Sequence, residues 1–343
     1  MAVARFGSLV ARGVTAVAHD ADDLTTGFWV VVVTFEGELT AVRMDRVSRE
    51  EARTDDPAGG WPGLSGEWST SLDRTAYLAG IAEIRRRIAA GTVYQVNLCR
   101  ILEHALADDA RLDDLGHRLA IGNPAPFAAT IDLPDAGLEI ACASPEVYLR
   151  RSGSRVTSRP IKGTASTEAG LRPKDYAENV MIVDLVRNDL GHVSRPGTVE
   201  VDHLCRVEQH PGLVHLVSDV SGRLRPGIRW SDLLHASFPP GSVSGAPKHT
   251  ALLSISDLEP VARGPYCGAV GWLDADRDEA MLAVGIRTFW AARDGEGRRV
   301  LRFGTGAGIT WGSDAVQEWE ETELKAARLV ALAAGGQSES GRV

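Results

Sequence analysis

The sequence predicts a mixed fold of strands and amphipathic helices, and two local patterns support it. Valine-rich apolar segments, Phe28–Phe35 and Leu39–Met44, form a predicted hairpin about Glu36-Gly37. Large apolar residues recur at helical spacing through Leu72–Ala90, and Gly91 follows as a helix stop. A chain of 343 residues, 44% of them hydrophobic, can bury one large core or two ordinary ones.

Further elements follow in order along the chain. Short strands are predicted at Tyr94–Leu98, Phe127–Asp132, Leu138–Ala143 and Val147–Arg150, and helices at Ala110–Ala120, at Lys174–Asp189 and after Asp314. Thr54–Thr70 is rich in Gly, Pro, Asp and Ser and is predicted to be a connecting loop.

Composition excludes several classes of function. A net charge of −9 argues against nucleic acid as the main partner. The longest apolar run, Phe28–Phe35, is too short to cross a bilayer, so we expect no membrane partner. The N-terminus carries no export signal, and four scattered cysteines suit reduced thiols better than disulfides or a zinc site. We therefore expect a cytoplasmic protein.

The most informative stretch is Ser158–Thr164, which contains a lysine between Ile161 and Gly163. Pro160 has a fixed φ and Gly163 allows close backbone approach, so the segment is predicted to be a stiff, irregular strand end. A desolvated lysine has a lowered pKa and can act as a nucleophile near neutral pH. A solvated loop lysine is the alternative for Lys162.

Carboxylates occur at three further places. Glu146 follows a predicted strand and is either a surface charge or, if it faces the same cavity as Lys162, a proton donor. Asp175 and Glu178 share the first turn of a helix, where they either favour its positive end or bind a hard cation.

The C-terminal helix has a similar pattern. Asp314 is a predicted N-cap, with Gln317 placed to close a capping box. Glu318, Glu321 and Lys325 lie on one face, as either a solvated charge ladder or a site.

Three glycine-rich segments separate these helices: Phe238–Lys248, Tyr266–Trp272 and Phe303–Gly308. The first is a long turn able to present backbone amides and Lys248 to an anion. The third does not satisfy the dinucleotide-binding fingerprint, because no helix follows it directly.

In combination, the motifs from Leu72 to Leu332 resemble the chorismate-utilising enzymes, and within them the aminodeoxychorismate synthases. The motifs that carry the resemblance are Tyr94–Leu98, Ser144–Glu146, Pro160–Thr164, Glu178–Asp189, Phe238–Lys248, Tyr266–Gly271, Ile286–Thr288 and Asp314–Lys325. The resemblance implies an α+β fold, a sandwich of two large, mostly antiparallel sheets flanked by helices, as in anthranilate synthase. It also implies an active site in the cleft between the sheets.

Two positions indicate the reaction that the resemblance implies. Anthranilate synthases have Ala where this chain has Lys162, and isochorismate and salicylate synthases have a water-activating Lys where it has Gln95. The combination implies amination of chorismate at C4 to 4-amino-4-deoxychorismate, for 4-aminobenzoate and folate synthesis. Lys162 would attack C2 to form a covalent intermediate, and Glu146 would protonate the departing hydroxyl group.

The resemblance also assigns the remaining site residues. Glu178 and Glu321, supported by Glu318 and Asp175, would bind Mg²⁺. His215 and Thr164 join Lys162 and Glu146 as catalytic residues. The substrate-binding residues would be Arg287, Tyr266, Gly306, Ala307, Gly308, Lys325 and Gln95.

The sequence departs from the family in three ways. No counterpart of the tryptophan-binding Leu-Glu-Ser segment is found, and the segment before Arg287 carries an apparent insertion at 278–281. None of the four cysteines lies in the Gly-x-Cys-x-Gly context of a glutaminase nucleophile, so we expect a separate glutamine amidotransferase subunit to supply ammonia.

We expect a short N-terminal β region and loop over residues 1–70, a chorismate-binding catalytic domain over 71–334 and a disordered tail over 335–343. Two alternatives to the amination of chorismate at C4 remain. One is anthranilate synthase component I, and the other is a non-catalytic chorismate-binding regulatory subunit.

Overall fold

The predicted hairpin near the N-terminus is confirmed. A computed structural model describes residues 2–51, 60–210 and 213–336. In it β3 (Phe28–Val33) pairs with β4 (Leu39–Arg49) in antiparallel register. Gly37 has a φ of +94° and donates its amide to Thr34 O at 2.8 Å, so the turn uses the left-handed conformation that glycine allows.

The remaining strands are distributed along the whole chain. Their bounds are β1 (Val3–Phe6), β2 (Leu9–Ala18), β5 (Ser69–Thr70), β6 (Gln95–Ala105), β7 (Phe127–Leu133), β8 (Leu138–Ser144), β9 (Val147–Ser152), β10 (Arg155–Arg159), β11 (Ile161–Ala165), β12 (Glu200–His210), β13 (Leu213–Arg223), β14 (Gly245–Ala246), β15 (Ala269–Asp274), β16 (Glu279–Val284), β17 (Thr288–Arg293) and β18 (Arg299–Ile309).

Hydrogen bonds join these strands into one 18-stranded antiparallel sheet. In one half of the sheet, the order of hydrogen-bonded neighbours is β12–β13–β10–β9–β16–β15–β3–β4–β2, and β11 also pairs with β13. The other half runs β7–β8–β17–β18–β6, with β5 and β14 on β6. Strand β1 pairs with both β2 and β7 and thus joins the halves.

The two halves share one hydrophobic core. Its largest cluster includes Val30 on β3 and Leu282 on β16 from the first half, together with Val96 on β6 and Ile140 on β8 from the second. The predicted α+β fold is therefore confirmed, and the two expected sheets are connected through β1.

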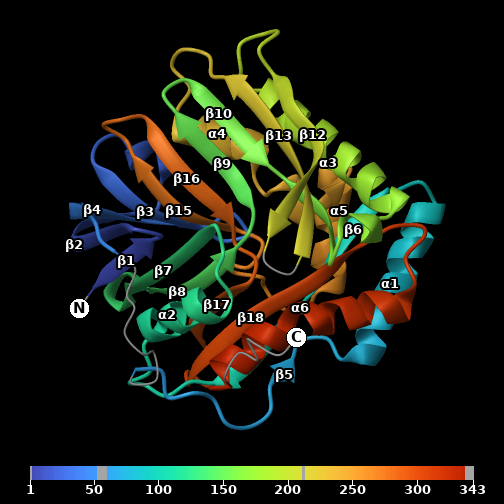
Figure 1. Cartoon of the computed structure of the whole chain (residues 1–343), viewed down its shortest axis with the longest axis horizontal. Coiled ribbons are helices and arrows are strands. Elements are labelled where there is room, and N and C mark those ends of the chain that lie inside the picture. Colours follow the sequence, from blue (N-terminus) through green and yellow to red (C-terminus); the bar gives the residue numbers. More distant parts are fainter. Residues whose placement is uncertain (1, 52–59, 211–212, 337–343) are drawn as a thin grey trace.

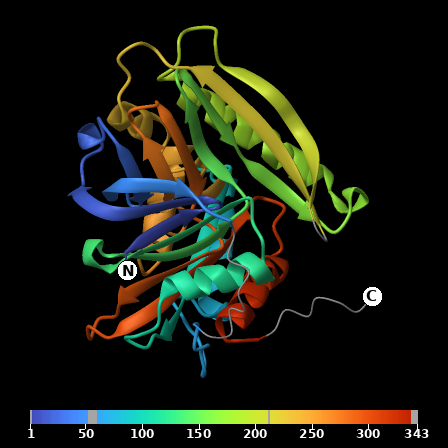
Figure 2. The same ribbon diagram turned by 60° about the vertical axis from the view of Figure 1, so that its left-hand side comes forward.

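In the described part of the chain, six α-helices cover the sheet. They are α1 (Arg74–Ala89), α2 (Leu112–Gly122), α3 (Pro173–Gly191), α4 (Trp230–Ser237), α5 (Lys248–Leu258) and α6 (Ala315–Ala333). Helix α6 lies along β18 and contacts α1 and α2, whereas α3 packs on β11, β12 and β13 (Figure 1). Figure 2 shows the green and yellow strands between residues 147 and 223 as one layer with α3 against it.

The apolar periodicity of Lys174–Asp189 predicts that Val180 shares a buried face with Val183 and Val186, which is wrong for Val180. It is 48% exposed, and Ile182, Val183 and Val186 form the buried side of α3. The capping box predicted for α6 is also only partly present. Asp314 does cap α6 by accepting hydrogen bonds from the amides of Val316 and Gln317. The reciprocal bond from the Gln317 side chain is not formed among the described residues, so the capping box is incomplete.

Other expectations concern the cysteines, the membrane and the tail. Cys99, Cys142, Cys205 and Cys267 are all free, as predicted. Among the helices of the described residues, none combines the length and apolar character needed to cross a membrane. Most of the predicted disordered tail, residues 337–343, lies outside the described part of the chain.

The core packing of α1 predicts a clear difference between two isoleucines. Ile81 is fully buried on α1, whereas Ile121 on α2 is 53% exposed. Ile81→Ala should lower the free energy of unfolding by roughly 2–5 kcal/mol, because it removes buried methyl groups and leaves a cavity. Ile121→Ala should change it by about 0.5 kcal/mol or less. Urea denaturation followed by tryptophan fluorescence measures both, and equal effects would contradict this packing.

Candidate active site

A cavity of about 600 Å³ lies between the β11–α3 region and the β18–α6 region. It collects most of the predicted site residues, although they are far apart in the sequence. The ones that line it are Glu146, Lys162, Thr164, Asp175, Glu178, His215, Arg287, Gly306, Gly308, Glu318, Glu321 and Lys325. Gln95, Tyr266 and Ala307 are not part of its wall. This cavity is the candidate active site.

The irregular backbone of β11 places Lys162 in the cavity. The register with β13 shifts between Ile161 and Thr164, and Gly163 has a φ of +84°. A Cβ on Gly163 would lie only 2.8 Å from Asp175 Cβ, so glycine here lets α3 approach the strand closely. The stiff, irregular strand end expected around Lys162 is therefore present.

Burial lowers the pKa of the Lys162 amine below its usual value. The carboxylates of Glu178 and Glu146 act in the opposite direction, and Lys325 adds to the lowering. Burial of the amine in protein disfavours its charged form, which leaves more of the neutral nucleophile near pH 7.

Lysine is rare in this chain, and most of its lysines lie at the cavity. Only four of the 37 Lys and Arg residues are lysines: Lys162, Lys174, Lys248 and Lys325. Three of them line the cavity, and Lys248 binds Asp189 at the end of α3 instead. The expectation that Lys248 faces an anion in the turn was therefore wrong, because its amine is 2.7 Å from Asp189 Oδ2.

Glu146 lies between β8 and β9 and is 4% exposed. Burial raises the pKa of its carboxyl group to about 7, although Ser242, Lys162 and the Ile161 amide act to lower it. A carboxyl group with this pKa can both donate and accept a proton near neutral pH. Glu146 and Lys162 face the same cavity, so the surface-charge alternative for Glu146 does not apply.

Thr164 and His215 form a pair on neighbouring strands. They are opposite each other in the β11–β13 register, and Thr164 Oγ1 is 2.8 Å from His215 Nδ1. The hydrogen bond fixes the imidazole ring at the cavity wall.

Helices α3 and α6 contribute five carboxylates to the cavity, including the four predicted metal ligands, and basic groups lie beside them. Lys325 Nζ is 2.6 Å from Glu321 Oε1, and Lys174 Nζ is 3.7 Å from Glu318 Oε1. Burial would raise the pKa of Glu321, but Lys325, Lys174 and Lys162 outweigh burial and lower it. Burial dominates at Glu178 and raises its pKa.

Asp175 has a second, structural role. Its Oδ2 accepts the backbone amide of Arg172 at 2.8 Å, which completes the N-terminal cap of α3. The helix-stabilising alternative considered for Asp175 is thus present in the structure, and Asp175 also lines the cavity.

The four carboxylates suit a hard divalent cation by their chemistry. No group of three or more His, Cys, Asp or Glu side chains within the described residues is gathered to hold a metal ion. Mg²⁺ does not require such a cage, because it binds through one or two carboxylates, substrate oxygens and water. Two helices that direct carboxylates into one cavity meet that requirement.

Arg287 is a cation without a partner carboxylate at the cavity wall. It has a φ of +53°, and no salt bridge joins its guanidinium to an acidic side chain of the part of the chain that is described. Burial, with help from Arg328, lowers its pKa. A partly buried arginine facing a cavity is suited to bidentate capture of an anionic ligand group.

Strand β18 forms the floor of the cavity, and its glycines allow close contacts. A Cβ on Gly304 would lie 2.0 Å from the ring of Tyr266. A Cβ on Gly308 would lie 2.4 Å from Gln95 Nε2 and 3.6 Å from Lys162 Nζ, so Gln95 and Lys162 lie on the same face of this strand. Ala307 is fully buried.

The sequence analysis did not single out Ser242, which lies in the turn between α4 and α5. Ser242 lines the cavity and lies within hydrogen-bonding reach of the Glu146 side chain. The glycine- and proline-rich character of Phe238–Lys248 indicated an unusual turn, but nothing local indicated that its serine meets Glu146.

Comparisons with known proteins agree with this site. Residues 17–331 match the protein family described as chorismate binding enzyme. The chain is 38% identical to anthranilate synthase component 1 of Streptomyces coelicolor over 77% of its length and 52% of the relative. It is 34% identical to aminodeoxychorismate synthase component 1 of Bacillus subtilis over 77% of its length and 57% of the relative. The chain thus spans about half the length of these curated relatives.

Solved structures show the same fold. Anthranilate synthase component I of Streptococcus pneumoniae superposes with a TM-score of 0.74 at 25% identity, covering 91% of this chain and 82% of that one. The menaquinone-specific isochorismate synthase of Escherichia coli superposes with a TM-score of 0.79 at 19% identity, covering 96% and 88%.

The four lysines allow a direct test of the lowered pKa of Lys162. Reductive methylation with ¹³C-formaldehyde gives one NMR signal for each accessible lysine, and Lys162→Arg assigns the signal of Lys162. That signal should titrate below the usual lysine pKa. Glu178→Gln should lower the pKa of Lys162 further, because the Glu178 carboxylate favours the charged amine.

Asp184→Asn is the matched control, because Asp184 is an exposed carboxylate on the same helix, paired with Arg187. It should leave the Lys162 titration unchanged. A Lys162 signal with the usual lysine pKa, or one indifferent to the loss of Glu178, would contradict the described burial.

Proposed function

The chain belongs to the family of chorismate-binding enzymes, and we propose that it aminates chorismate at C4 to give 4-amino-4-deoxychorismate. One observation carries this proposal: the amine of Lys162, with a lowered pKa, shares a cavity with the carboxyl group of Glu146, whose pKa is about 7. A nucleophile and a proton donor at one site suit a displacement of the C4 hydroxyl group through a covalent intermediate.

The first half of the reaction attaches the lysine. The neutral amine of Lys162 forms a bond to C2, the ring double bonds shift, and the C4–O bond breaks. Glu146 gives its proton to the departing hydroxyl group, which leaves as water. A covalent step divides one difficult substitution into two easier ones.

The second half reverses the electron movement. Ammonia forms a bond to C4, the double bonds shift back, and the C2–nitrogen bond to Lys162 breaks. Glu146, now ionised, takes the proton released by the attacking ammonia. The net change replaces the C4 hydroxyl group with an amino group and keeps the enolpyruvyl side chain.

Two basic residues of the cavity wall, Arg287 and Lys325, suit the two carboxylates of chorismate. Arg287, which has no salt bridge within the described residues, would bind the enolpyruvyl carboxylate. Lys325 and the glycine-rich part of β18 would bind the ring carboxylate. Lys325 already lies at this floor, since its Nζ donates to Gly306 O at 3.0 Å.

Mg²⁺ is part of the proposal. Glu178 and Glu321 would hold it, with Glu318 and Asp175 in support, and the cation would neutralise the ring carboxylate and withdraw electrons from the diene. The basic side chains Lys174 and Lys325 now lie beside the carboxylates of Glu318 and Glu321, so cation binding would compete with these pairs.

A separate glutamine amidotransferase is the proposed source of ammonia. The curated relatives are named as component 1 of their synthases, which supports a second subunit for this chain as well. The product would enter 4-aminobenzoate and folate synthesis.

Anthranilate synthase activity is the second candidate, because the relative from Streptomyces coelicolor is 38% identical to this chain. That reaction places nitrogen at C2 and releases pyruvate. Lys162 argues against it, since the anthranilate enzymes have alanine at this position.

A product assay distinguishes these candidates. With chorismate, Mg²⁺ and ammonium salt, the purified chain should form 4-amino-4-deoxychorismate without pyruvate, as measured by mass spectrometry and a lactate dehydrogenase coupled assay. Lys162→Ala should lose this product, because the other two amines of the cavity, Lys174 and Lys325, are paired with Glu318 and Glu321. Anthranilate and pyruvate from the wild-type chain would refute C4 amination, and chorismate binding without turnover would support a regulatory subunit.

Arg287→Ala should raise KM for chorismate by about tenfold to hundredfold, because it removes charge-assisted hydrogen bonds to a carboxylate. Arg287→Lys should recover part of the loss by keeping the charge without the bidentate geometry. Arg277→Ala is the control, since Arg277 is 75% exposed at its side chain and pairs only with Asp274. Steady-state kinetics measures all three, and an unchanged KM in Arg287→Ala would remove Arg287 from the substrate site.

A further inference from the structure

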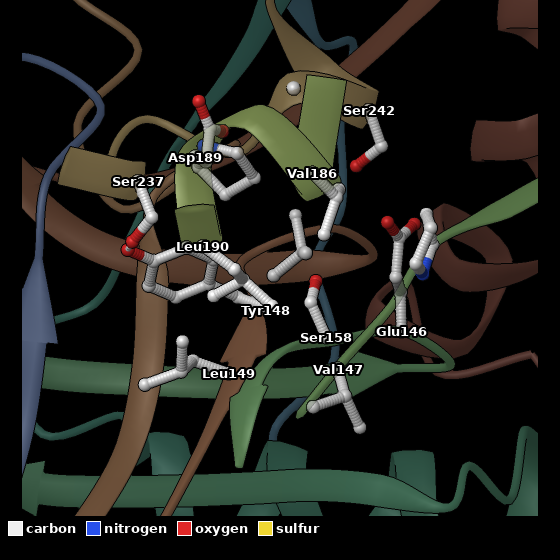
Figure 3. A pocket seen from close by; sticks show the side chains of 14 residues that line it. Glu146, Val147, Tyr148, Leu149, Ser158, Val186, Asp189, Leu190, Ser237 and Ser242 are labelled. Atoms are coloured by element: carbon white, nitrogen blue, oxygen red, sulfur yellow. Dashed lines mark hydrogen bonds between the residues drawn. The ribbon is translucent and has the colours of Figure 1, made fainter. Parts of the chain in front are cut away.

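A small buried chamber lies behind Glu146, on the other side from Lys162. Its volume is about 20 Å³, and Figure 3 shows the side chains that surround it. Glu146 and Ser242 line both this chamber and the large cavity, so together they form the wall between the two spaces. The residues that line the chamber are all buried.

The chamber is polar enough to hold one water molecule and too small for more. The hydroxyl of Ser158 faces it, and no hydrogen bond joins that hydroxyl to another described residue (Figure 3). On the far wall, Tyr148 Oη and Ser237 Oγ are 2.6 Å apart. Glu146 is therefore shielded from bulk water on this side, and its hydrogen bonds must come from the protein or from a single water.

Two protein groups beside Glu146 lower the pKa of its carboxyl group: the hydroxyl of Ser242, which lines both spaces with Glu146, and the backbone amide of Ile161, which lines the large cavity. The Ile161 amide belongs to β11, directly before Lys162. Ser242 belongs to the turn between α4 and α5, in a 3₁₀ segment at Gly241–Val243. Glu146 is thus held between the strand that carries the nucleophile and an independent turn.

The turn that carries Ser242 is fixed at both ends. On one side, Lys248 Nζ donates to Asp189 Oδ2 at 2.7 Å and to Ser237 O at 3.1 Å, which ties the turn to the end of α3. On the other side, Arg263 Nη1 donates to Val243 O at 2.9 Å. These bonds leave Ser242 little freedom to move away from Glu146.

We propose that Ser242 is a positioning residue, whose hydroxyl orients the Glu146 carboxyl group toward the cavity and stabilises its ionised form. The buried Asp189–Lys248 pair supports it by fixing the turn. A hydroxyl group donates most strongly to an ionised carboxylate, so this contact would be strongest after Glu146 has given up its own proton. The catalytic consequence rests on the proposed function, because it requires Glu146 to act as acid and base.

Several other groups surround Glu146 and affect its ionisation. Lys162 on β11 is the nearest cation, with Glu178 on α3 beside it, and Arg287 lies before β17 on the same cavity. Across the chamber lie Tyr148 on β9 and Asp189, paired with Lys248. Substitution of Ser242 leaves all of these in place, so a change in titration can be assigned to its hydroxyl group.

The test is an infrared titration of buried carboxyl groups in the full chain without substrate, with Glu146→Gln used to assign the Glu146 band. Ser242→Ala should raise the Glu146 titration midpoint by about one pH unit, because a hydrogen bond that favours the carboxylate is lost. Ser242→Thr should restore the wild-type midpoint. Ser254→Ala is the matched control, as Ser254 is a buried serine on α5 that bonds only to Thr250 O.

Steady-state kinetics adds a measurement that would not change if Ser242 only supported the fold. In Ser242→Ala, kcat should fall by about tenfold to hundredfold with KM for chorismate little changed, and the alkaline limb of the kcat profile should move to higher pH. An unmoved Glu146 midpoint in Ser242→Ala, or an equal effect in Ser254→Ala, would overturn the proposal. The infrared test needs no substrate, so a wild-type chain that leaves chorismate unchanged would refute the proposed function alone.

Discussion

The pairing of β18 with β6 is the constraint on which the candidate site depends. Ten residue pairs, Val300–Ala105 through Ile309–Val96, hold the two strands in fixed register. Pairing of β18 with β17 stops at Phe303, so the following glycine-rich half is free of β17 and forms the cavity floor. Because α6 packs on β18, the same strand also fixes Glu318, Glu321 and Lys325 relative to the cavity.

The glycines of this floor allow neighbouring groups to approach β18 closely. A Cβ at Gly306 would lie 2.6 Å from Leu98 O, and those at Gly304 and Gly308 would overlap Tyr266 and Gln95. The Cβ at Gly308 would also lie 3.6 Å from Lys162 Nζ. Side chains at these positions would push these neighbours away from the strand, so close packing accounts for the glycine pattern.

Charge is concentrated in the candidate active-site cavity. Acidic and basic side chains from β11, α3 and α6 meet there, and each changes the ionisation of its neighbours. Burial favours neutral Lys162 and protonated Glu146, whereas nearby lysines keep Glu321 ionised. The opposite protonation behaviour of two carboxyl groups in one cavity thus follows from their different surroundings.

Local chemistry was sufficient to predict much of this protein from its sequence. Periodicity located α1, α3 and α6, and the isolation of Lys162 from acidic sequence neighbours indicated a lysine of unusual pKa. Contacts between segments that are distant in the sequence could not be predicted from local patterns. The partner of Lys248 is Asp189, 59 positions away, and no pattern near either residue reveals the pair. The same is true of Ser242 beside Glu146.

The scarcity of lysine has a practical consequence for handling this protein. Arginine supplies almost all of its positive charge, so reagents that couple to side-chain amines have only four targets, all in or directly behind the cavity. Immobilisation on a sensor surface or dye labelling through lysine would therefore block the site or disturb the Asp189 pair. Among the native thiols, only Cys205 is partly exposed, since Cys99, Cys142 and Cys267 are buried. Attachment through a cysteine introduced on the exposed face of α2, at Ile121 for example, would leave the cavity open.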